Sequence, residues 1–199
     1  MDYNSEEGYL ELIYGPMKSG KTSLLLQLYK QFKFCEVQCM VINHEKDKGR
    51  YSESCLSNHD KNMIPCDYAN NLTSLVSFAG NSIISGTHID EFLKSKVILI
   101  NEAQFFEDIV EWVTTATEIY KKKVYICGLN NDFKRKAFGN WLDLLLICDK
   151  VTPLKSWCSV CRKNQALFSH RLTAEQDKIV IGVDNYIPLC RTCWLKLNV

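Results

Sequence analysis

The spacing of apolar residues near the start of the chain predicts a strand, a helix and a second strand. Residues 10–14 are Leu-Glu-Leu-Ile-Tyr, a short apolar run that stops at Gly15 and Pro16. Over residues 21–34, leucine and phenylalanine recur every three or four positions without proline or glycine, which predicts a helix. Residues 37–43 are rich in valine, methionine and isoleucine and predict the second strand. A helix that connects two strands in this way predicts that the strands lie parallel in one sheet.

The pattern is mixed over residues 44–87, where the sequence places elements only loosely, and becomes regular again afterwards. Residues 96–100 contain a continuous apolar run of the kind found in strands that are buried on both faces. Residues 105–120 predict a helix, and residues 123–129 predict a further strand. This alternation predicts a doubly wound α/β core with a mainly parallel sheet. The three lysines at 121–123 follow the predicted helix, where the dipole favours cations, so we expect them in solvent.

Composition places the chain among globular proteins. Its 199 residues are 46% hydrophobic and 24% charged, a length that suits one domain or one domain with a small appendage. The formal net charge of +1 gives no support to binding of nucleic acid or of an anionic membrane. The first twenty residues contain no continuous apolar stretch, and no run of about 18 apolar residues occurs anywhere. We therefore expect a cytoplasmic protein without nucleic-acid or membrane partners.

A phosphate-binding motif follows the first predicted strand. The pattern G-x-x-x-x-G-K-[ST] is matched by Gly15, Pro16, Met17, Lys18, Ser19, Gly20, Lys21 and Thr22. Its glycines let the backbone wrap closely around an anion, so that amide groups and the start of the next helix point at the phosphates. In this motif Lys21 reaches the β- and γ-phosphates, and the Thr22 hydroxyl binds Mg²⁺. Because the motif lies between a predicted strand and a predicted helix, it favours binding of a nucleoside triphosphate over a chance match.

Asn101 and Glu102 follow the buried strand predicted at residues 96–100. The carboxyl end of that strand is expected beside the phosphate loop, where a carboxylate is suited to accept a proton from a nucleophile. The alternative is that Glu102 only stabilises the start of a helix through the helix dipole. Phosphate-loop enzymes usually carry a metal-binding acid at the position of Asn101. From Asn101 we therefore expect a weak magnesium contact through water.

The ten cysteines form two groups. Six are scattered, whereas the other four form two C-x-x-C pairs, Cys158 with Cys161 and Cys190 with Cys193. In a reducing compartment such pairs are typical of a tetrahedral zinc site, the alternative being a disulfide pair or free thiols. The 28 residues between the pairs exceed the span of a compact ribbon, which predicts a long loop tied at its base by the metal. Four thiolates close the site, so its predicted role is structural.

These features, in this order, resemble the zinc-containing (type II) thymidine kinase family over nearly the whole chain. The Gly-Pro-Met start of the phosphate loop at 15–17 resembles the family's own loop, and residues 102–106, Glu-Ala-Gln-Phe-Phe, resemble its next conserved segment. Residues 50–52 and 59–60 resemble its flexible loop over the phosphates. Residues 133–139, Phe-Lys-Arg-Lys-Ala-Phe-Gly, resemble a further family stretch, and the cysteine pairs bound its zinc-tied lasso.

The resemblance implies a phosphate-loop (RecA-like) α/β domain over residues 1–151 and a small zinc lasso domain over residues 152–199. It implies transfer of the γ-phosphate of ATP to the 5′-hydroxyl of thymidine, with Glu102 as general base and Arg50 stabilising the transferring phosphoryl group. It also implies a homotetramer that is inhibited by thymidine triphosphate (dTTP). By the same resemblance, the thymine lies among Met17, Phe105, Leu129, Phe133, Phe138, Ile181, Gly182 and Tyr186.

Two departures from the family pattern concern acidic residues. Family members usually have Asp at position 101, and another Asp two residues before the loop arginine, where this chain has Lys48. Asp47 lies one residue away and is suited to compensate. These departures predict a raised magnesium requirement. They also keep open a catalytically impaired regulatory paralogue, while a nucleic-acid-dependent ATPase with a zinc ribbon is the other alternative.

Overall fold

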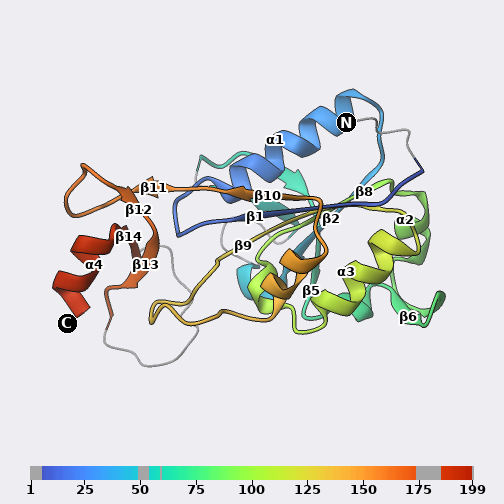
Figure 1. Ribbon diagram of the computed structural model, residues 1–199. Helices are drawn as coiled ribbons and strands as arrows, with labels where there is room; N and C mark the ends of the chain where they lie inside the picture. The colour runs from blue at the N-terminus through green and yellow to red at the C-terminus, as the bar shows by residue number, and fades with distance from the viewer. Residues whose placement is uncertain (1–5, 49–53, 59, 174–184, 199) are drawn as a thin grey trace.

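Six parallel strands form a central sheet (Figure 1). The computed structural model describes residues 6–48, 54–58, 60–173 and 185–198. All neighbouring pairs of the sheet are parallel, which confirms the predicted α/β class and the parallel sheet. In spatial order the strands are β10 (Lys150–Pro153), β1 (Tyr9–Tyr14), β9 (Lys123–Gly128), β8 (Val97–Ile100), β2 (Cys39–His44) and β5 (Asp67–Ala69).

Helices cover both faces of the sheet because successive residues of a strand point to opposite sides. In β8, Val97 and Leu99 join the apolar cluster of α1, whereas Ile98 and Ile100 join the cluster of α2, α3 and η4. Each face therefore buries its own core, and the strand ends are fixed from both sides. The helices are α1 (Lys21–Phe34), α2 (Ile89–Lys94) and α3 (Ile109–Glu118), with 3₁₀ turns η1 (Glu45–Asp47), η2 (Leu72–Ser74), η3 (Ala103–Phe105) and η4 (Trp141–Leu146).

The predicted elements of the core are present, with one helix shorter than expected. Helix α1 has the predicted bounds, and β1, β2, β8 and β9 lie within two residues of theirs. The helix predicted over 105–120 begins only at Ile109. Glu102 has a left-handed backbone (φ 54°) and Phe106 an extended one, so the residues between them form only the turn η3.

The expectation of solvent-exposed lysines at 121–123 is wrong for two of them. Lys122 and Lys123 are buried, whereas Lys121 is exposed. Lys122 Nζ donates hydrogen bonds to the carbonyl oxygens of Leu93 (3.2 Å) and Ser95 (2.7 Å), at the carboxyl end of α2. Burial lowers the pKa of Lys122 to about 8. The charge pattern did not reveal this because the carbonyls that bind Lys122 lie almost thirty positions earlier in the chain.

Five short strands lie in the described part of residues 44–87. β3 (Cys55–Ser57) pairs antiparallel with β4 (Met63–Pro65), and β6 (Ser77–Ala79) pairs antiparallel with β7 (Ser82–Ser85). The fifth, β5, joins the edge of the central sheet beside β2. Strands of three or four residues are too short for alternation to be read from sequence, which is why the segment gave no firm elements.

A small cysteine-rich unit follows β10 and lies beside the phosphate loop (Figure 1). We call the described residues from 156 onward the cysteine unit. Its buried core is small and consists of Cys158, Leu189, Cys190, Cys193 and Trp194. Residues 178–183, whose sequence also predicts a strand, lie outside the described residues. The elements of the unit are β11 (Ser156–Trp157), β12 (Gln165–Ala166), β13 (Phe168–Arg171), β14 (Tyr186–Leu189) and α4 (Arg191–Asn198).

None of the helices that the structure describes is both long enough and apolar enough to span a bilayer.

Candidate functional site

The phosphate-binding motif forms the turn between β1 and α1. Gly20 has a left-handed backbone (φ 86°) at the start of α1 and offers no side chain to cap the helix, so the first backbone N–H groups stay available to a ligand. A Cβ at Gly15 would lie 2.4 Å from the carbonyl oxygen of Leu154. Lys21 Nζ donates to the carbonyl oxygens of Gly15 (3.1 Å) and Pro16 (2.8 Å). A side chain would therefore clash with the backbone at position 15 and would strain the left-handed backbone at position 20.

Lys21 is one of the two lysines of this loop, and its ammonium group bonds to carbonyl oxygens of the loop itself. Burial lowers the pKa of Lys21, and the negative charge of Glu102 acts in the opposite direction. The end of β8, where Glu102 lies, is therefore close enough to the loop for the two charges to interact. The fold thus brings Glu102 close to the phosphate loop, the position expected from the sequence.

A chain of hydrogen bonds leads from Thr22 to a carboxylate. Thr22 Oγ1 donates to Asn101 Oδ1 (3.5 Å), which also accepts from Cys127 Sγ (3.0 Å). Asn101 Nδ2 donates to Asn43 Oδ1 (3.0 Å), and Asn43 Nδ2 donates to Asp47 Oδ2 (3.0 Å). Asn43 and Asn101 are buried, so this chain is fixed in place. Hydroxyl, amide and carboxylate oxygens are the donors that Mg²⁺ prefers, and the residues present fit that ion.

Glu102 itself is held by its neighbour Gln104. Its backbone lies in the left-handed region, which is unusual for a residue with a side chain and typical of functional sites. Gln104 Nε2 donates a hydrogen bond to Glu102 Oε2. Glu102 is the N-cap residue of the three-residue turn η3 and makes no side-chain capping hydrogen bond there, whereas α3 begins only at Ile109. The helix-dipole alternative for Glu102 therefore concerns this single 3₁₀ turn and not α3.

The residues expected around the thymine gather near these strand ends. The rings of Phe105 and Phe138 meet edge to face, with centroids 5.5 Å apart. Leu129 follows β9, and Met17 belongs to the phosphate loop. Met17 N–H donates to Ser169 Oγ (2.9 Å), and so connects that loop to β13 of the cysteine unit. Two separate parts of the fold thus meet at one place.

Arg171, which no sequence pattern indicated, connects two further candidate residues, Phe133 and Tyr186. Its guanidinium lies 3.8 Å from the centroid of the Phe133 ring and donates to Tyr186 Oη through Nε (3.1 Å) and Nη2 (2.6 Å). Arg171 is 5% exposed, so this contact is desolvated and strong. No signal in the sequence marked it, because Phe133, Arg171 and Tyr186 come from three separate segments.

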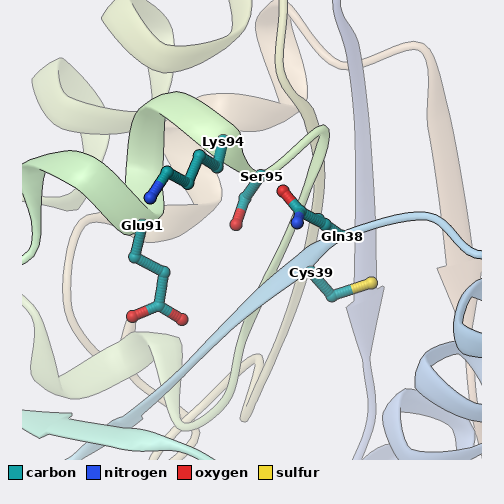
Figure 2. A pocket seen from close by; sticks show the side chains of 5 residues that line it. All are labelled: Gln38, Cys39, Glu91, Lys94 and Ser95. Atoms are coloured by element: carbon teal, nitrogen blue, oxygen red, sulfur yellow. The ribbon is translucent and has the colours of Figure 1, made fainter.

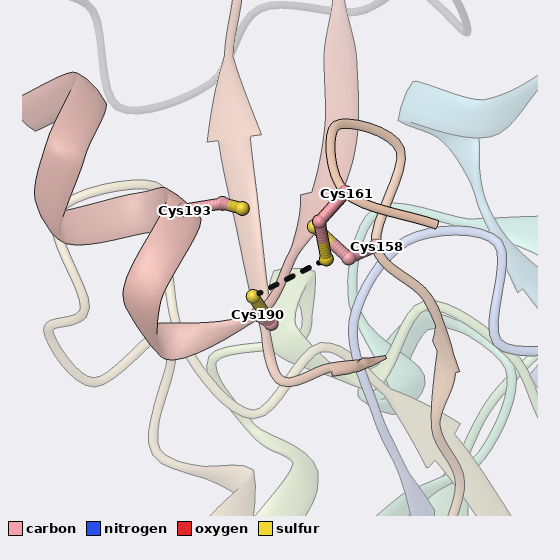
Figure 3. Close-up of side chains that lie close together, drawn as sticks. All are labelled: Cys158, Cys161, Cys190 and Cys193. Atoms are coloured by element: carbon pink, nitrogen blue, oxygen red, sulfur yellow. Dashed lines mark hydrogen bonds between the residues drawn. The ribbon is translucent and has the colours of Figure 1, made fainter. Parts of the chain in front are cut away.

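The four paired cysteines converge in the cysteine unit (Figure 3). Their sulfurs all lie within 4.8 Å of one another, and those of Cys161 and Cys190 are 3.9 Å apart. Four sulfurs bound to one zinc ion at about 2.3 Å lie about 3.8 Å apart. Burial opposes ionisation of Cys158, but hydrogen bonds from backbone N–H groups outweigh it and lower its pKa to about 6. The four thiols can hold a zinc ion, as predicted.

Comparison with known proteins identifies the family. A family model described as thymidine kinase matches residues 8–194. The thymidine kinase of fowlpox virus (strain NVSL) is 36% identical over 193 residues, which cover 95% of this chain and 98% of the relative. The cytosolic thymidine kinase of Gallus gallus is 33% identical over 190 residues, which cover 95% of this chain and 78% of the relative.

The chain belongs to the thymidine kinase family. A further relative, the thymidine kinase of Yaba monkey tumor virus (strain VR587), is 34% identical over 196 residues, covering 98% of this chain and 99% of the relative. Membership in the thymidine kinase family confirms the resemblance that the motifs indicated. The matched range includes the phosphate loop and all four paired cysteines.

Three residues that the resemblance assigned to the thymidine kinase site lie outside the described residues. They are Arg50, expected near the transferring phosphoryl group, and Ile181 and Gly182, expected in the lasso. Their assignments remain predictions. The other expected residues occupy the strand ends and the adjoining face of the cysteine unit.

A pocket of about 380 Å³ lies between the start of β2 and the end of α2 (Figure 2). It is lined by residues at the start of β2 and the end of α2, namely Gln38, Cys39, Glu91, Lys94 and Ser95. Because the sheet is parallel, the start of β2 is at the opposite edge from the phosphate loop. None of its five lining residues belongs to the candidate site described above.

Proposed function

We propose that the protein is a thymidine kinase that transfers the γ-phosphoryl group of ATP to the 5′-hydroxyl of thymidine, forming thymidine monophosphate and ADP. The observation that supports this most is the position of Glu102 at the end of β8, where its charge acts on Lys21 of the phosphate loop. A proton acceptor beside a triphosphate loop is what phosphoryl transfer to an alcohol requires.

In the proposed reaction, Glu102 accepts the proton of the 5′-hydroxyl while that oxygen forms a bond to the γ-phosphorus. The bond from the γ-phosphorus to the bridging oxygen breaks, and ADP leaves. The backbone of residues 15–22 and the Lys21 ammonium bind the phosphates. The Thr22 hydroxyl, and Asn101 through water, would hold Mg²⁺, which would neutralise charge at the phosphates. Arg50 stabilises the charge on the transferring group.

Thymine recognition in this proposal rests on apolar and aromatic surfaces. Phe105 and Phe138 form one wall through their edge-to-face contact, and Phe133 is fixed from one side by Arg171. A planar base suits such surfaces because ring stacking buries apolar area with little loss of side-chain freedom. The residues proposed to surround it are Met17, Phe105, Leu129, Phe133, Phe138, Ile181, Gly182 and Tyr186.

The experiment that tests the function is thymidine-dependent conversion of γ-labelled ATP. Glu102→Gln should reduce kcat by about 10²- to 10⁴-fold, because the proton acceptor is lost, while ATP binding measured by calorimetry stays nearly unchanged. Glu107→Gln, an exposed neighbour in the chain, is the matched control and should remain active. Normal turnover by Glu102→Gln would show that Glu102 is not the base.

One observation supports a second candidate, a regulatory paralogue with impaired catalysis. Asn101 stands where phosphate-loop enzymes usually carry an acid, and its side chain makes neutral hydrogen bonds with Thr22, Asn43 and Cys127. Nucleotide binding without any thymidine-dependent consumption of ATP would favour this candidate. ATP hydrolysis that needs DNA but not thymidine would instead favour a nucleic-acid-dependent ATPase.

We also propose a structural zinc ion at the four cysteines, a division into residues 1–151 and 152–199, and a cytoplasmic homotetramer that is inhibited by dTTP. The suggested boundary falls within β10, so that the last strand of the sheet leads directly into the cysteine unit. Zinc analysis by mass spectrometry, light scattering for the oligomer and dTTP titration of the kinase reaction test these points.

A further inference from the structure

Gln104 occupies a buried position between the end of β8 and the end of β9. It is 4% exposed, and its Oε1 accepts a hydrogen bond from the Leu129 N–H at 2.9 Å. A backbone N–H can only donate, so this bond fixes which end of the amide is oxygen and leaves Nε2 facing Glu102. Nε2 donates to Glu102 Oε2. One amide therefore links the carboxylate of Glu102 to the backbone of Leu129.

The backbone at Gly128 and Gly139 packs closely against Gln104. A Cβ at Gly128 would lie 2.7 Å from Gln104 Oε1, and a Cβ at Gly139 would lie 2.6 Å from the Gln104 carbonyl oxygen. Trp141 Nε1 donates to the carbonyl oxygen of Leu129 at 3.1 Å. Gln104 therefore binds the N–H of Leu129, while Trp141 binds its carbonyl oxygen. Because Leu129 is held in this way, the side-chain oxygen of Gln104 is anchored to a fixed partner.

We propose that Gln104 is a positioning residue that holds the Glu102 carboxylate in the orientation needed for proton transfer and couples it to the backbone at Leu129. This proposal rests on the proposed function, in which Glu102 is the general base. A free glutamate side chain samples several rotamers, whereas proton transfer needs its oxygen within hydrogen-bond distance of the hydroxyl. A charge-assisted hydrogen bond from an anchored amide selects one orientation.

Replacing Gln104 with methionine tests the loss of the amide at nearly constant size. We expect kcat for thymidine phosphorylation to fall about 10- to 100-fold, with the KM for ATP changed less than about threefold, because the phosphate loop is untouched. Gln31→Met, the same exchange at an exposed position on α1, is the control and should keep wild-type kinetics. The melting temperature of each variant, with and without ADP, shows whether it is folded.

Gln104→Glu separates positioning from mere packing, because it keeps the size and the acceptor for the Leu129 N–H. Once ionised it has no proton to donate to Glu102 and repels it, so kcat at pH 8 should fall at least as far as in Gln104→Met. Lys21 and the Cys127 thiol, which interact electrostatically with Glu102, are the same in all variants.

The side-chain carboxyl signal of Glu102 provides a readout that does not depend on turnover. In protein labelled with ¹³C at glutamate Cδ, and assigned with Glu102→Gln, the Glu102 signal should move in Gln104→Met and stay in Gln31→Met. If the variants show these signal changes but the wild-type protein phosphorylates no thymidine, the positioning of Glu102 by Gln104 stands and the proposed function is wrong. An unmoved signal, or Gln104→Glu with kcat within about twofold of wild type at pH 8, would overturn the role of Gln104.

Discussion

The strand-end site and the cysteine unit face one another but are built differently. The strand ends carry Thr22, Asn101 and Glu102 on a sheet with an apolar core on each face. The cysteine unit carries Tyr186 on a two-stranded sheet, and three of its five buried core residues are cysteines. One half of the proposed active site is therefore held by ordinary apolar packing, whereas the small core of the other half is built around four cysteines that can hold a zinc ion.

The largest effect that this comparison predicts follows from removing the metal. Chelation, or Cys190→Ala, should abolish amide-exchange protection in β13, β14 and α4 while β1, β8 and β9 keep theirs. Structural zinc contributes about 10–16 kcal/mol, whereas a buried apolar side chain such as Leu189 contributes about 1.5–3 kcal/mol. Hydrogen exchange with mass spectrometry measures both regions in one sample.

Cys148→Ala is the control for this experiment, since Cys148 lies outside the four-cysteine cluster. It should retain one zinc ion per chain and the wild-type exchange pattern. Equal protection of α4 in metal-free and metal-loaded protein would show that the cysteine unit folds without zinc and would remove the contrast between the two regions.

A second prediction concerns the strand-end side. Lys21→Met should lower the affinity for MgATP about 10- to 100-fold, since hydrogen bonds to charged groups contribute about 1.5–3 kcal/mol. The exchange protection of the sheet should persist, because α1 is anchored by its apolar face. Calorimetric titration with a non-hydrolysable ATP analogue measures the change. Lys30→Met, an exposed position on the same helix, should bind as the wild type does.

Lys122 allows the packing of the α/β core to be probed far from the site. Lys122→Met removes the donors to the Leu93 and Ser95 carbonyls and should lower the free energy of unfolding by about 1–3 kcal/mol at neutral pH. Lys121→Met, its exposed neighbour, should stay within about 0.5 kcal/mol of wild type. Urea denaturation measures both variants.

The pH dependence of this difference has a definite sign. Burial lowers the pKa of Lys122 from 10.5 to about 8 in the folded protein. Between these values the unfolded chain binds the proton and the folded chain does not, so unfolding takes up protons and this group stabilises the fold increasingly as pH rises. Wild type should therefore gain stability relative to Lys122→Met from pH 8 to pH 10. A constant difference would show that Lys122 titrates normally.

The smallest predicted effect concerns magnesium. Asn101→Asp adds a negative charge next to Thr22 and should lower the half-saturating magnesium concentration, whereas Asp47→Asn removes the carboxylate at the end of the hydrogen-bond chain and should raise it. Each shift should be about three- to tenfold after screening by water. Magnesium titration of kinase activity, supported by Mn²⁺ binding measured by electron paramagnetic resonance, tests both. Asp90→Asn, which changes an exposed acid on α2, should leave both the half-saturating magnesium concentration and Mn²⁺ binding unchanged.

The sequence predicted the strand-end region better than its surroundings, and the reason is physical. The phosphate loop is a local motif, since its glycines, lysine and threonine act through a single turn, and α1 has the predicted bounds. Arg171 and Gln104 were not recognised because their partners, Phe133 and Leu129, lie more than twenty positions away in the chain. Lys122 was misjudged because only the fold shows that carbonyl oxygens surround it.

The backbone of Glu102 has a consequence for engineering. Its left-handed conformation costs about 1–3 kcal/mol for a residue with a side chain, and glycine would adopt it without that cost. Glu102→Gly would relieve that backbone cost, but it would also remove the group proposed to drive turnover and leave the buried Gln104 Nε2 without its acceptor. The strained backbone is thus kept at the one position where the proposed chemistry needs a carboxylate.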